Sequence, residues 1–377
     1  MRRLRKVRGS VLIIVMVTLL FTTFAMVTFV EKAGVDLLVE VRESSARHLR
    51  QKAYSALEVT LAVLEDFRQA DGGLRSPAEG WNDPLGFANW TPGDGYTADV
   101  SFEDESGKIS LAHVTPATLT ELFKSWQFSQ SDAEKLTDGL MSWMQKDYVP
   151  TGSFTPDYDN GALPYVVPQR SLRSFSELAA IDAVRDVFYD KDGRPNEYWH
   201  RFANTFSLFD FKQSNLNAAT PDVLSAFGNS DLSSQQRLGE YLSGTGAYAN
   251  QGPGFFQNSG DAASVLGGNS VPAGFGTVIS ALRINITIHR GRTQFRLTAV
   301  VAPPGGASTV LANPALTALP DDKNPDKTAT TQQPSTSAST GVTTTTTAGK
   351  KLNYPFTLLE IRENVEIPPT PAPAPQA

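Results

Sequence analysis

The segment that most constrains this chain is an uncharged apolar run from Val11 to Val30. About 20 residues, at about 1.5 Å per residue of helix, are enough to cross a hydrocarbon core about 30 Å thick. Five basic residues precede the run, at positions 2, 3, 5, 6 and 8. Because Lys and Arg are enriched on the cytoplasmic side of membrane helices, this pattern predicts a cytoplasmic N-terminus and an exported remainder.

Three interpretations of this beginning stay open. A secretory signal peptide has a shorter apolar core, of about 7 to 15 residues, followed by a small-residue cleavage site. Thr23-Phe24-Ala25 offers such a site, but cleavage there leaves an apolar stub on the mature chain. An uncleaved signal anchor is the second interpretation, and the third follows from a family resemblance described below.

Composition sets the scale of the exported part. The chain has 377 residues, of which 40% are hydrophobic and 19% charged, with a formal net charge of -6 and no cysteine. Apart from the membrane helix and the low-complexity stretches, this is material for one or two modest domains. The basic excess lies in the leader, so nothing indicates a nucleic-acid surface. The missing cysteines exclude disulfides and thiolate chemistry.

A helical pattern continues beyond the apolar run. Apolar residues recur at three- and four-residue spacings as far as Phe67, and Asp71-Gly72-Gly73 then ends the helix. We expect one transmembrane and spine helix over residues 10–71. The stripe is too irregular for a sustained heptad, which favours packing on the protein's own sheet over a coiled-coil stalk. The stripe consists of Leu38, Val41, Leu49, Ala53, Leu57, Leu61, Leu64 and Phe67.

Alternating segments predict a sheet in two parts. In residues 72–114, Tyr96–Phe102 and Lys108–Leu111 are expected to form a hairpin of short strands. In residues 278–302, two longer strands flank Arg290-Gly291-Arg292, a tight turn in which Gly suits a positive φ. A last strand is possible by pattern in residues 352–366. The expected fold class is α+β, with the long N-terminal helix packed on an antiparallel sheet.

Between the two parts, residues 115–241 predict a large helical insert. Helices are expected to begin at Thr115-Pro116, Ser131, Ser174 and Thr220-Pro221. Residues 242–277 are expected to be a flexible Gly-rich connection. Residues 303–351 are rich in Thr, Ser and Pro and are expected to be disordered, and the Pro-rich tail 367–377 is expected to be extended.

Several loose motifs, in a shared order, resemble the K-type minor pseudopilins of type II secretion, a family with a type IV pilin-like fold. The order of these motifs is more specific than any one of them. The matching segments are Arg8-Gly9-Ser10, residues 105–111 (ESGKISL), 140–147 (LMSWMQKD), 163–165 (LPY), 174–178 (SFSEL) and 214–224 (SNLNAATPDVL).

The resemblance implies how the chain is processed and where it works. A prepilin peptidase would remove leader residues 1–9 by cleaving between Gly9 and Ser10, and Ser10 would become the N-methylated terminus. The membrane helix, with Val11, Ile14, Leu20 and Val30, would stay intact. Most pilins carry Glu at the fifth mature position, but this chain has Ile14 there, as K-type members do. The implied location is the inner membrane, single-pass, with a cytoplasmic N-terminus and a periplasmic globular part.

The implied function is that of a minor pseudopilin at the tip of the type II secretion pseudopilus, acting in protein export. A bulky insert would prevent another subunit from stacking above it, and a bare carboxylate at position 14 would be costly in lipid. The implied partners are other minor pseudopilins and the inner-membrane secretion platform, with secreted substrates or the outer-membrane channel as further contacts. The alternative is a minor type IV pilin-like subunit for adhesion or DNA uptake.

An acidic loop, which contains Asp147, Asp157 and Asp159, carries the single candidate metal site. Carboxylate and amide oxygens suit calcium, and the resemblance implies calcium in the inserted region. The spacing does not fit an EF-hand, so a solvated polar loop is an equal alternative.

No catalytic constellation is visible, so we expect no enzyme and no cofactor other than calcium. The four His residues lack ligand spacing, and there is no phosphate-binding loop or nucleophile elbow. Residues 217–228 resemble a helix-hairpin-helix without a basic cluster, which favours a structural role. Asn215 and Asn217 are expected to satisfy backbone groups where the chain enters this helix.

Overall fold

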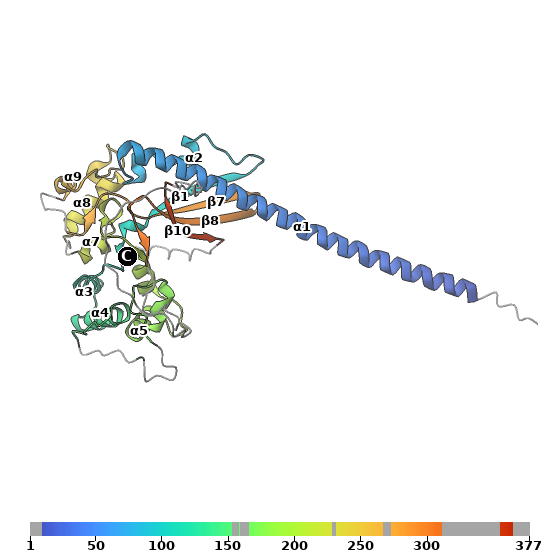
Figure 1. Cartoon of the computed structure of the whole chain (residues 1–377), viewed down its shortest axis with the longest axis horizontal. Helices are drawn as coiled ribbons and strands as arrows, with labels where there is room; N and C mark the ends of the chain where they lie inside the picture. Colours follow the sequence, from blue (N-terminus) through green and yellow to red (C-terminus); the bar gives the residue numbers. More distant parts are fainter. Residues whose placement is uncertain are drawn as a thin grey trace, which may run out of the picture.

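One long helix carries two packed cores at its C-terminal end (Figure 1). The computed structural model describes residues 10–152, 158, 166–227, 231–266, 273–310 and 355–364. One core joins the helix to an antiparallel sheet, and the other fills a block of short helices. The class predicted from the sequence is confirmed: an α+β fold with a long N-terminal helix on an antiparallel sheet and a helical insert.

The long helix α1 (Ser10–Asp71) has two halves in different surroundings. Large apolar side chains between Leu12 and Val41 are exposed, whereas the buried stripe begins at Leu49. Of the predicted stripe, Val41 is exposed, so the packed face starts later than expected. Gly72, with φ 69°, follows the last helical residue and turns the chain away. The buried members of the stripe are Leu49, Ala53, Leu57, Leu61 and Leu64.

The second half of α1 lies on a four-stranded antiparallel sheet with the order β1-β7-β8-β10. The strands are β1 (Thr97–Asp104), β7 (Leu282–Arg290), β8 (Thr293–Ala302) and β10 (Thr357–Glu363). Along β7, Ile284, Ile286 and Ile288 are buried and belong to the core that contains α1. Since side chains alternate along a strand, Arg283 points to the opposite face. The helix α2 (Pro84–Phe87) and the turn η1 (Pro77–Glu79) connect α1 to β1.

The hairpin predicted from 96 to 111 is wrong. β1 pairs instead with β7, from Thr97↔His289 to Asp104↔Leu282, and the turn η2 (Glu105–Gly107) leads the chain out of the sheet. β2 (Ile109–Ser110) then pairs in parallel with β3 (Phe206–Ser207) in the helical block. The sequence pattern identified both strands. A short Gly-containing turn between them does not determine which strand each of them pairs with.

The helical block has its own apolar core. Thr115 caps α3 and Thr220 caps α7, as predicted, whereas Ser129, not Ser131, caps α4. Ser174 opens the 3-10 turn η3 (Phe175–Ala180). The helices are α3 (Pro116–Ser125), α4 (Gln130–Met144), α5 (Asp182–Phe188), α6 (Glu197–Thr205), α7 (Pro221–Ala226), α8 (Leu232–Ser243) and α9 (Ser259–Val265).

Two segments predicted to be irregular contain structure. Residues 242–277, expected to be a flexible connection, include η5 (Gly246–Tyr248), α9 and β6 (Phe275–Gly276), which pairs with β5 (Ser214–Asn215). Within the segment expected to be disordered, β9 (Ser308–Thr309) pairs with β4 (Phe209–Asp210). Residues 311–354 and the tail after 364 lie outside the described residues.

Alanine substitutions at two glycines should change the free energy of unfolding in opposite directions, because their backbone conformations differ. Gly291, in the β7–β8 turn, has φ 59°, and Gly239 lies inside α8; an added Cβ would meet nothing within 4 Å at either position. We expect Gly291→Ala to lower the free energy of unfolding by about 1 kcal/mol, because Ala is strained at positive φ. Gly239→Ala should raise it by about 0.5–1 kcal/mol through helix propensity. Denaturant unfolding of the full chain in detergent would measure both, and equal effects would contradict this account.

Candidate functional site

The first part of the candidate site is the exposed half of α1. By length and composition, this is the one helix in the described residues that could cross a membrane, with a mean hydropathy of 2.5 in its most apolar window. Ile14, Leu20 and Val30 are all more than half exposed on it. Ser10 is its first residue, whereas Gly9 lies outside the described residues. The cleavage site and the N-methylated terminus therefore stay predictions.

The polar groups inside this apolar half are satisfied locally. Thr18, Thr22 and Thr28 donate their hydroxyls to the carbonyls of Ile14, Thr18 and Phe24, at 3.0, 2.8 and 3.1 Å. A hydroxyl bonded within its own helix does not need water. The half-helix can thus lie in lipid or against another apolar helix without leaving these donors unpaired.

The second part of the site is the junction that holds the helical block on the unit formed by α1 and the four-stranded sheet. Asn215, fully buried on β5, reaches two elements of that unit at once. Its Nδ2 donates to the Arg75 carbonyl at 2.9 Å and to Asp104 Oδ2 at 2.6 Å. Asp104, at the end of β1, also accepts from the Ser106 backbone N at 2.8 Å and the Ser106 hydroxyl at 2.6 Å. The side-chain amide of Asn215 therefore bonds both to the segment that follows α1 and to the end of β1.

Asn217 closes the same junction from the turn η4 (Leu216–Ala218). Its Oδ1 accepts from the Phe256 N–H at 2.7 Å, and its Nδ2 donates to the carbonyls of Phe256 and Thr277 at 3.1 and 3.0 Å. Gly107 approaches this turn so closely that a Cβ would lie 2.6 Å from that of Ala218. Asn215 Oδ1 accepts from the Asn217 N–H at 3.1 Å, so Asn215 satisfies a backbone group at this turn as predicted. For Asn217 the prediction is wrong, because its backbone partners are distant in sequence.

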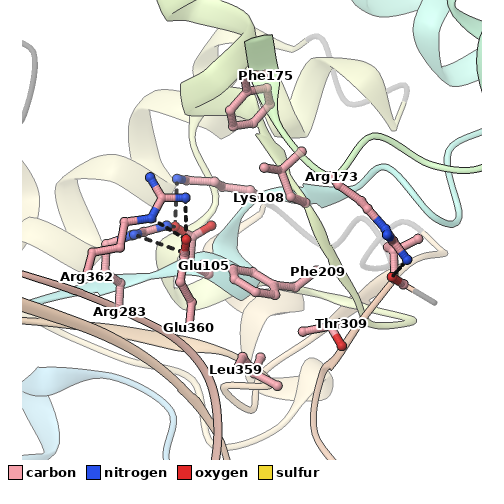
Figure 2. A pocket seen from close by; sticks show the side chains of 12 residues that line it. Glu105, Lys108, Arg173, Phe175, Phe209, Arg283, Thr309, Leu359, Glu360 and Arg362 are labelled. Atoms are coloured by element: carbon pink, nitrogen blue, oxygen red, sulfur yellow. Dashed lines mark hydrogen bonds and ion pairs between the residues drawn. The ribbon is translucent and has the colours of Figure 1, made fainter. Parts of the chain in front are cut away.

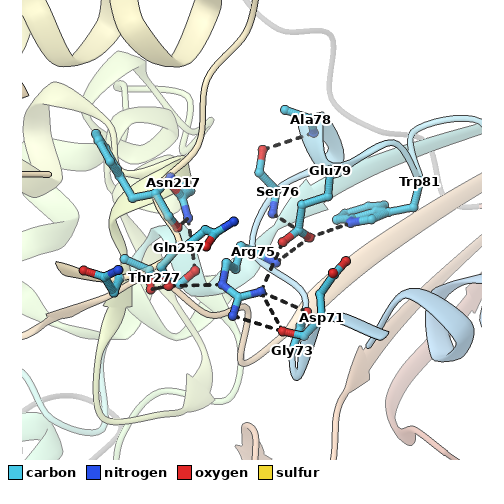
Figure 3. Close-up of polar contacts among 12 residues, drawn as sticks. Asp71, Gly73, Arg75, Ser76, Ala78, Glu79, Trp81, Asn217, Gln257 and Thr277 are labelled. Carbon is cyan, nitrogen blue, oxygen red and sulfur yellow. Dashed lines mark hydrogen bonds and ion pairs between the residues drawn. The ribbon is translucent and has the colours of Figure 1, made fainter. Parts of the chain in front are cut away.

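Arg75 joins the end of α1 to the helical block (Figure 3). Its Nε donates to the Gln257 carbonyl at 3.1 Å, ahead of α9, and its Nη atoms donate to the Asp71 carbonyl at 3.2 Å. A cation at a helix C-terminus complements the helix dipole. Glu79 holds Arg75 through the Arg75 backbone N at 2.9 Å and also accepts from Trp81 Nε1 at 3.0 Å. Since Trp81 is fully buried in the sheet core, the junction is anchored to that core.

Two neighbouring carboxyls at the junction, the half-buried Asp104 and the buried Glu105, differ in their pKa. Burial raises the pKa of Asp104 to about 6, despite the hydrogen bonds from Ser106 and Asn215. For Glu105, burial acts in the same direction, but the charges of Lys108 and Arg283 outweigh it and lower the pKa. The difference follows from geometry, because the basic side chains reach Glu105 and Asp104 receives neutral donors.

The predicted calcium residues are described only in part. Asp147 is an exposed residue with φ 57°, just after α4, whereas Asp157 and Asp159 lie outside the described residues. Within the described part of the chain, no group of three or more His, Asp or Glu side chains is placed to hold a metal ion. Asp138 on α4, fully buried, instead accepts hydrogen bonds from the loop that follows, from Tyr148 Oη at 2.7 Å and Gly152 N at 2.8 Å.

Sequence reasoning missed the roles of Asp104, Arg75 and Gln257. Asp104 belongs to an acidic turn that signalled only the end of a strand. Arg75 follows a Gly pair that signalled only the end of a helix. Neither local pattern shows that the two residues share a partner, Asn215, which is over 100 positions away in the chain.

The raised pKa of Asp104 predicts how the free energy of unfolding changes with pH, including the sign of the change. Its folded pKa of about 6 lies above the ordinary 3.8, so the folded chain holds the proton to higher pH than the unfolded chain. The free energy of unfolding should therefore fall as pH rises from about 4 to about 6, by on the order of 3 kcal/mol from this group. We expect Asp104→Asn to remove that part of the decline in denaturant titrations of the full chain.

The matched control is Asp66→Asn, an exposed aspartate on α1. It should leave the pH profile of the wild type unchanged. An Asp104→Asn variant whose unfolding free energy declines with pH as steeply as that of the wild type would refute the assignment.

Comparison with known proteins bears on the block and the junction. Residues 103–191 match the family model described as type II secretion system (T2SS), protein K. A chain in the crystal structure of the GspK-GspI-GspJ complex, from the type 2 secretion system of enterotoxigenic Escherichia coli, is similar at 13% identity and a TM-score of 0.47. The alignment covers 72% of this chain and 97% of that chain. None of the curated protein sequences matches significantly. Residues 103–191 therefore carry a domain of the type II secretion system protein K family, which confirms the resemblance predicted from the sequence.

Proposed function

We propose that this protein is a minor pseudopilin at the tip of the type II secretion pseudopilus. The observation that carries the proposal is the division of α1 into an exposed apolar half and a half packed on the sheet. Only a membrane or other apolar helices can cover the exposed half favourably, at about 25 cal/mol per Å² of apolar surface removed from water. The family match in residues 103–191, to type II secretion system protein K, supports a role of the chain in secretion.

The position of the helical block supports a place of this subunit at the tip of the pseudopilus. The block lies at the end of the head away from the exposed half of α1 (Figure 1). A further subunit added at that end would meet the block before its helix could pack beside α1. The junction at Asp104, Asn215 and Arg75 holds the block there through polar bonds to both units.

Ile14 supports the same position. Its side chain is 61% exposed near the beginning of α1, with apolar neighbours Ile13 and Val15. A subunit with none ahead of it has no neighbour's terminal amine to neutralise, and an apolar residue avoids an unpaired carboxylate in lipid.

The proposed location is the inner membrane, with one span, a cytoplasmic N-terminus and a periplasmic head. The proposed partners are other minor pseudopilins and the inner-membrane secretion platform, with prepilin peptidase acting between Gly9 and Ser10. The basic residues before the apolar run support this orientation.

N-terminal processing and fibre position test the proposal together. Mass spectrometry of the purified protein should find a chain that begins at N-methylated Ser10. An epitope placed on the block, at the exposed α6 residue Asn204, should label isolated fibres only at their ends. A chain that begins at Met1 or Met26, or labels along the shaft, would contradict the proposal.

Gly9→Leu should block cleavage and abolish secretion of an exported reporter, because a bulky residue replaces the small one at the cleavage position. Gly34→Leu is the matched control, since Gly34 lies in the exposed part of α1 with nothing within 4 Å of an added Cβ. It should leave processing intact.

We also propose that a calcium ion binds to the carboxylates of Asp147, Asp157 and Asp159. The support is the chemistry of three carboxylates within one short loop. Calcium should raise the thermal midpoint of the full chain in a concentration-dependent manner, and Asp157→Asn with Asp159→Asn should remove that rise. Asp192→Asn, an exposed substitution in the turn after α5, is the control. An unchanged midpoint of the wild type at millimolar calcium would exclude the site.

A further inference from the structure

A cavity of about 430 Å³ lies on the face of the sheet opposite α1 (Figure 2). It opens where the helical block meets the sheet. Arg173 and Phe175 come from the block, Phe209 from β4, Arg283 from β7, and Leu359 and Arg362 from β10. Asp104, Asn215 and Arg75 of the junction do not line this cavity, although Glu105 does. The function of the cavity is therefore open.

One side of the cavity is a balanced cluster of charges. Lys108 Nζ lies 2.6 Å from Glu103, and Arg283 pairs with Glu105. Arg362 pairs with Glu360, which gives three basic and three acidic side chains in this cluster. These pairs compensate one another, so this side carries little net charge to attract a ligand.

The opposite side of the cavity carries Arg173, which takes part in none of these three ion pairs. Its backbone N donates to Glu177 Oε1 at 3.0 Å, but its guanidinium donates to the Val310 carbonyl at 3.4 Å. Among the residues that the structure describes, this long bond to a neutral carbonyl leaves the positive charge uncompensated, and Arg173 is exposed. A carboxylate could replace that carbonyl with a stronger, charge-assisted bond.

Between the two sides, the floor and walls are apolar. Phe175, Phe209 and Leu359 point into the space in Figure 2. Phe209 also belongs to a small apolar cluster on this face of the sheet, with Val300 and Ala302. A cavity of this volume takes a few side chains and not a folded domain.

We infer that this cavity docks an acidic, apolar peptide segment of a partner protein. One carboxylate of the segment binds Arg173, and the adjacent apolar side chains pack on Phe175, Phe209 and Leu359. The charge complementarity at Arg173 selects an anionic segment, and the apolar floor selects aliphatic or aromatic neighbours. The inference rests on the proposed function, because α1 inside a fibre would turn this opposite face outward, toward soluble partners.

A defined probe tests the site: a fluorescein-labelled peptide of alternating aspartate and leucine, measured by fluorescence anisotropy with the full chain in detergent micelles. We expect the wild type to bind it and Arg173→Gln to weaken binding about tenfold, as for loss of one charge-assisted hydrogen bond. The same peptide with asparagine in place of aspartate should bind as weakly as the variant does. Leu359→Ser should weaken binding severalfold.

Arg185→Gln is the matched control, because Arg185 is a half-exposed arginine on α5 that pairs with Asp182 away from the cavity. It should keep binding within about twofold. No binding by the wild type, or equal losses in Arg173→Gln and Arg185→Gln, would overturn the site. Peptide binding by a chain that fails to enter fibres would overturn the proposed function alone. Normal fibres without peptide binding would overturn the site alone.

Discussion

The structure depends on a single continuous helix that has to satisfy two environments. Up to Val41 its apolar side chains are exposed, and from Leu49 onward its buried stripe supplies one layer of the sheet core. No Pro interrupts it, and the Thr hydroxyls of the first half bond to their own helix. Continuity matters because a kink between the halves would uncouple the head from whatever covers the exposed part.

The helical block is a second folding unit attached to the first by polar contacts. The two apolar cores have separate members, and the chain passes between them near Asp104 and Thr277. Buried amides at Asn215 and Asn217 fix this connection more directionally than apolar packing does, since each of their bonds has a required geometry. Burial of Asp104 makes the connection sensitive to pH, while the neighbouring Glu105 is held charged by Lys108 and Arg283.

Short sequence patterns predicted the starts of helices better than they predicted which strands pair with each other. Thr115-Pro116 and Thr220-Pro221 marked real helix starts because capping needs only neighbouring residues. β1 was recognised by its alternation, but its partner β7 lies about 180 positions away, and a period-2 pattern contains no information about that choice. The Gly-rich stretch before β7 suggested an irregular connection, yet it includes α9, whose cap at Asn258 is a weak signal among many polar residues.

The sequence alone determined the membrane-length helix, most of its packed stripe and the α+β class, because each depends on residues close together in the chain. It also determined the family resemblance, through the order of short motifs along the chain. Only the tertiary structure decided the strand order, the junction of Arg75, Asp104 and Asn215, and the cavity beside Arg173. Those features bring together residues that are distant in sequence, and the free energy that selects them comes from burial and hydrogen-bond geometry in the folded chain.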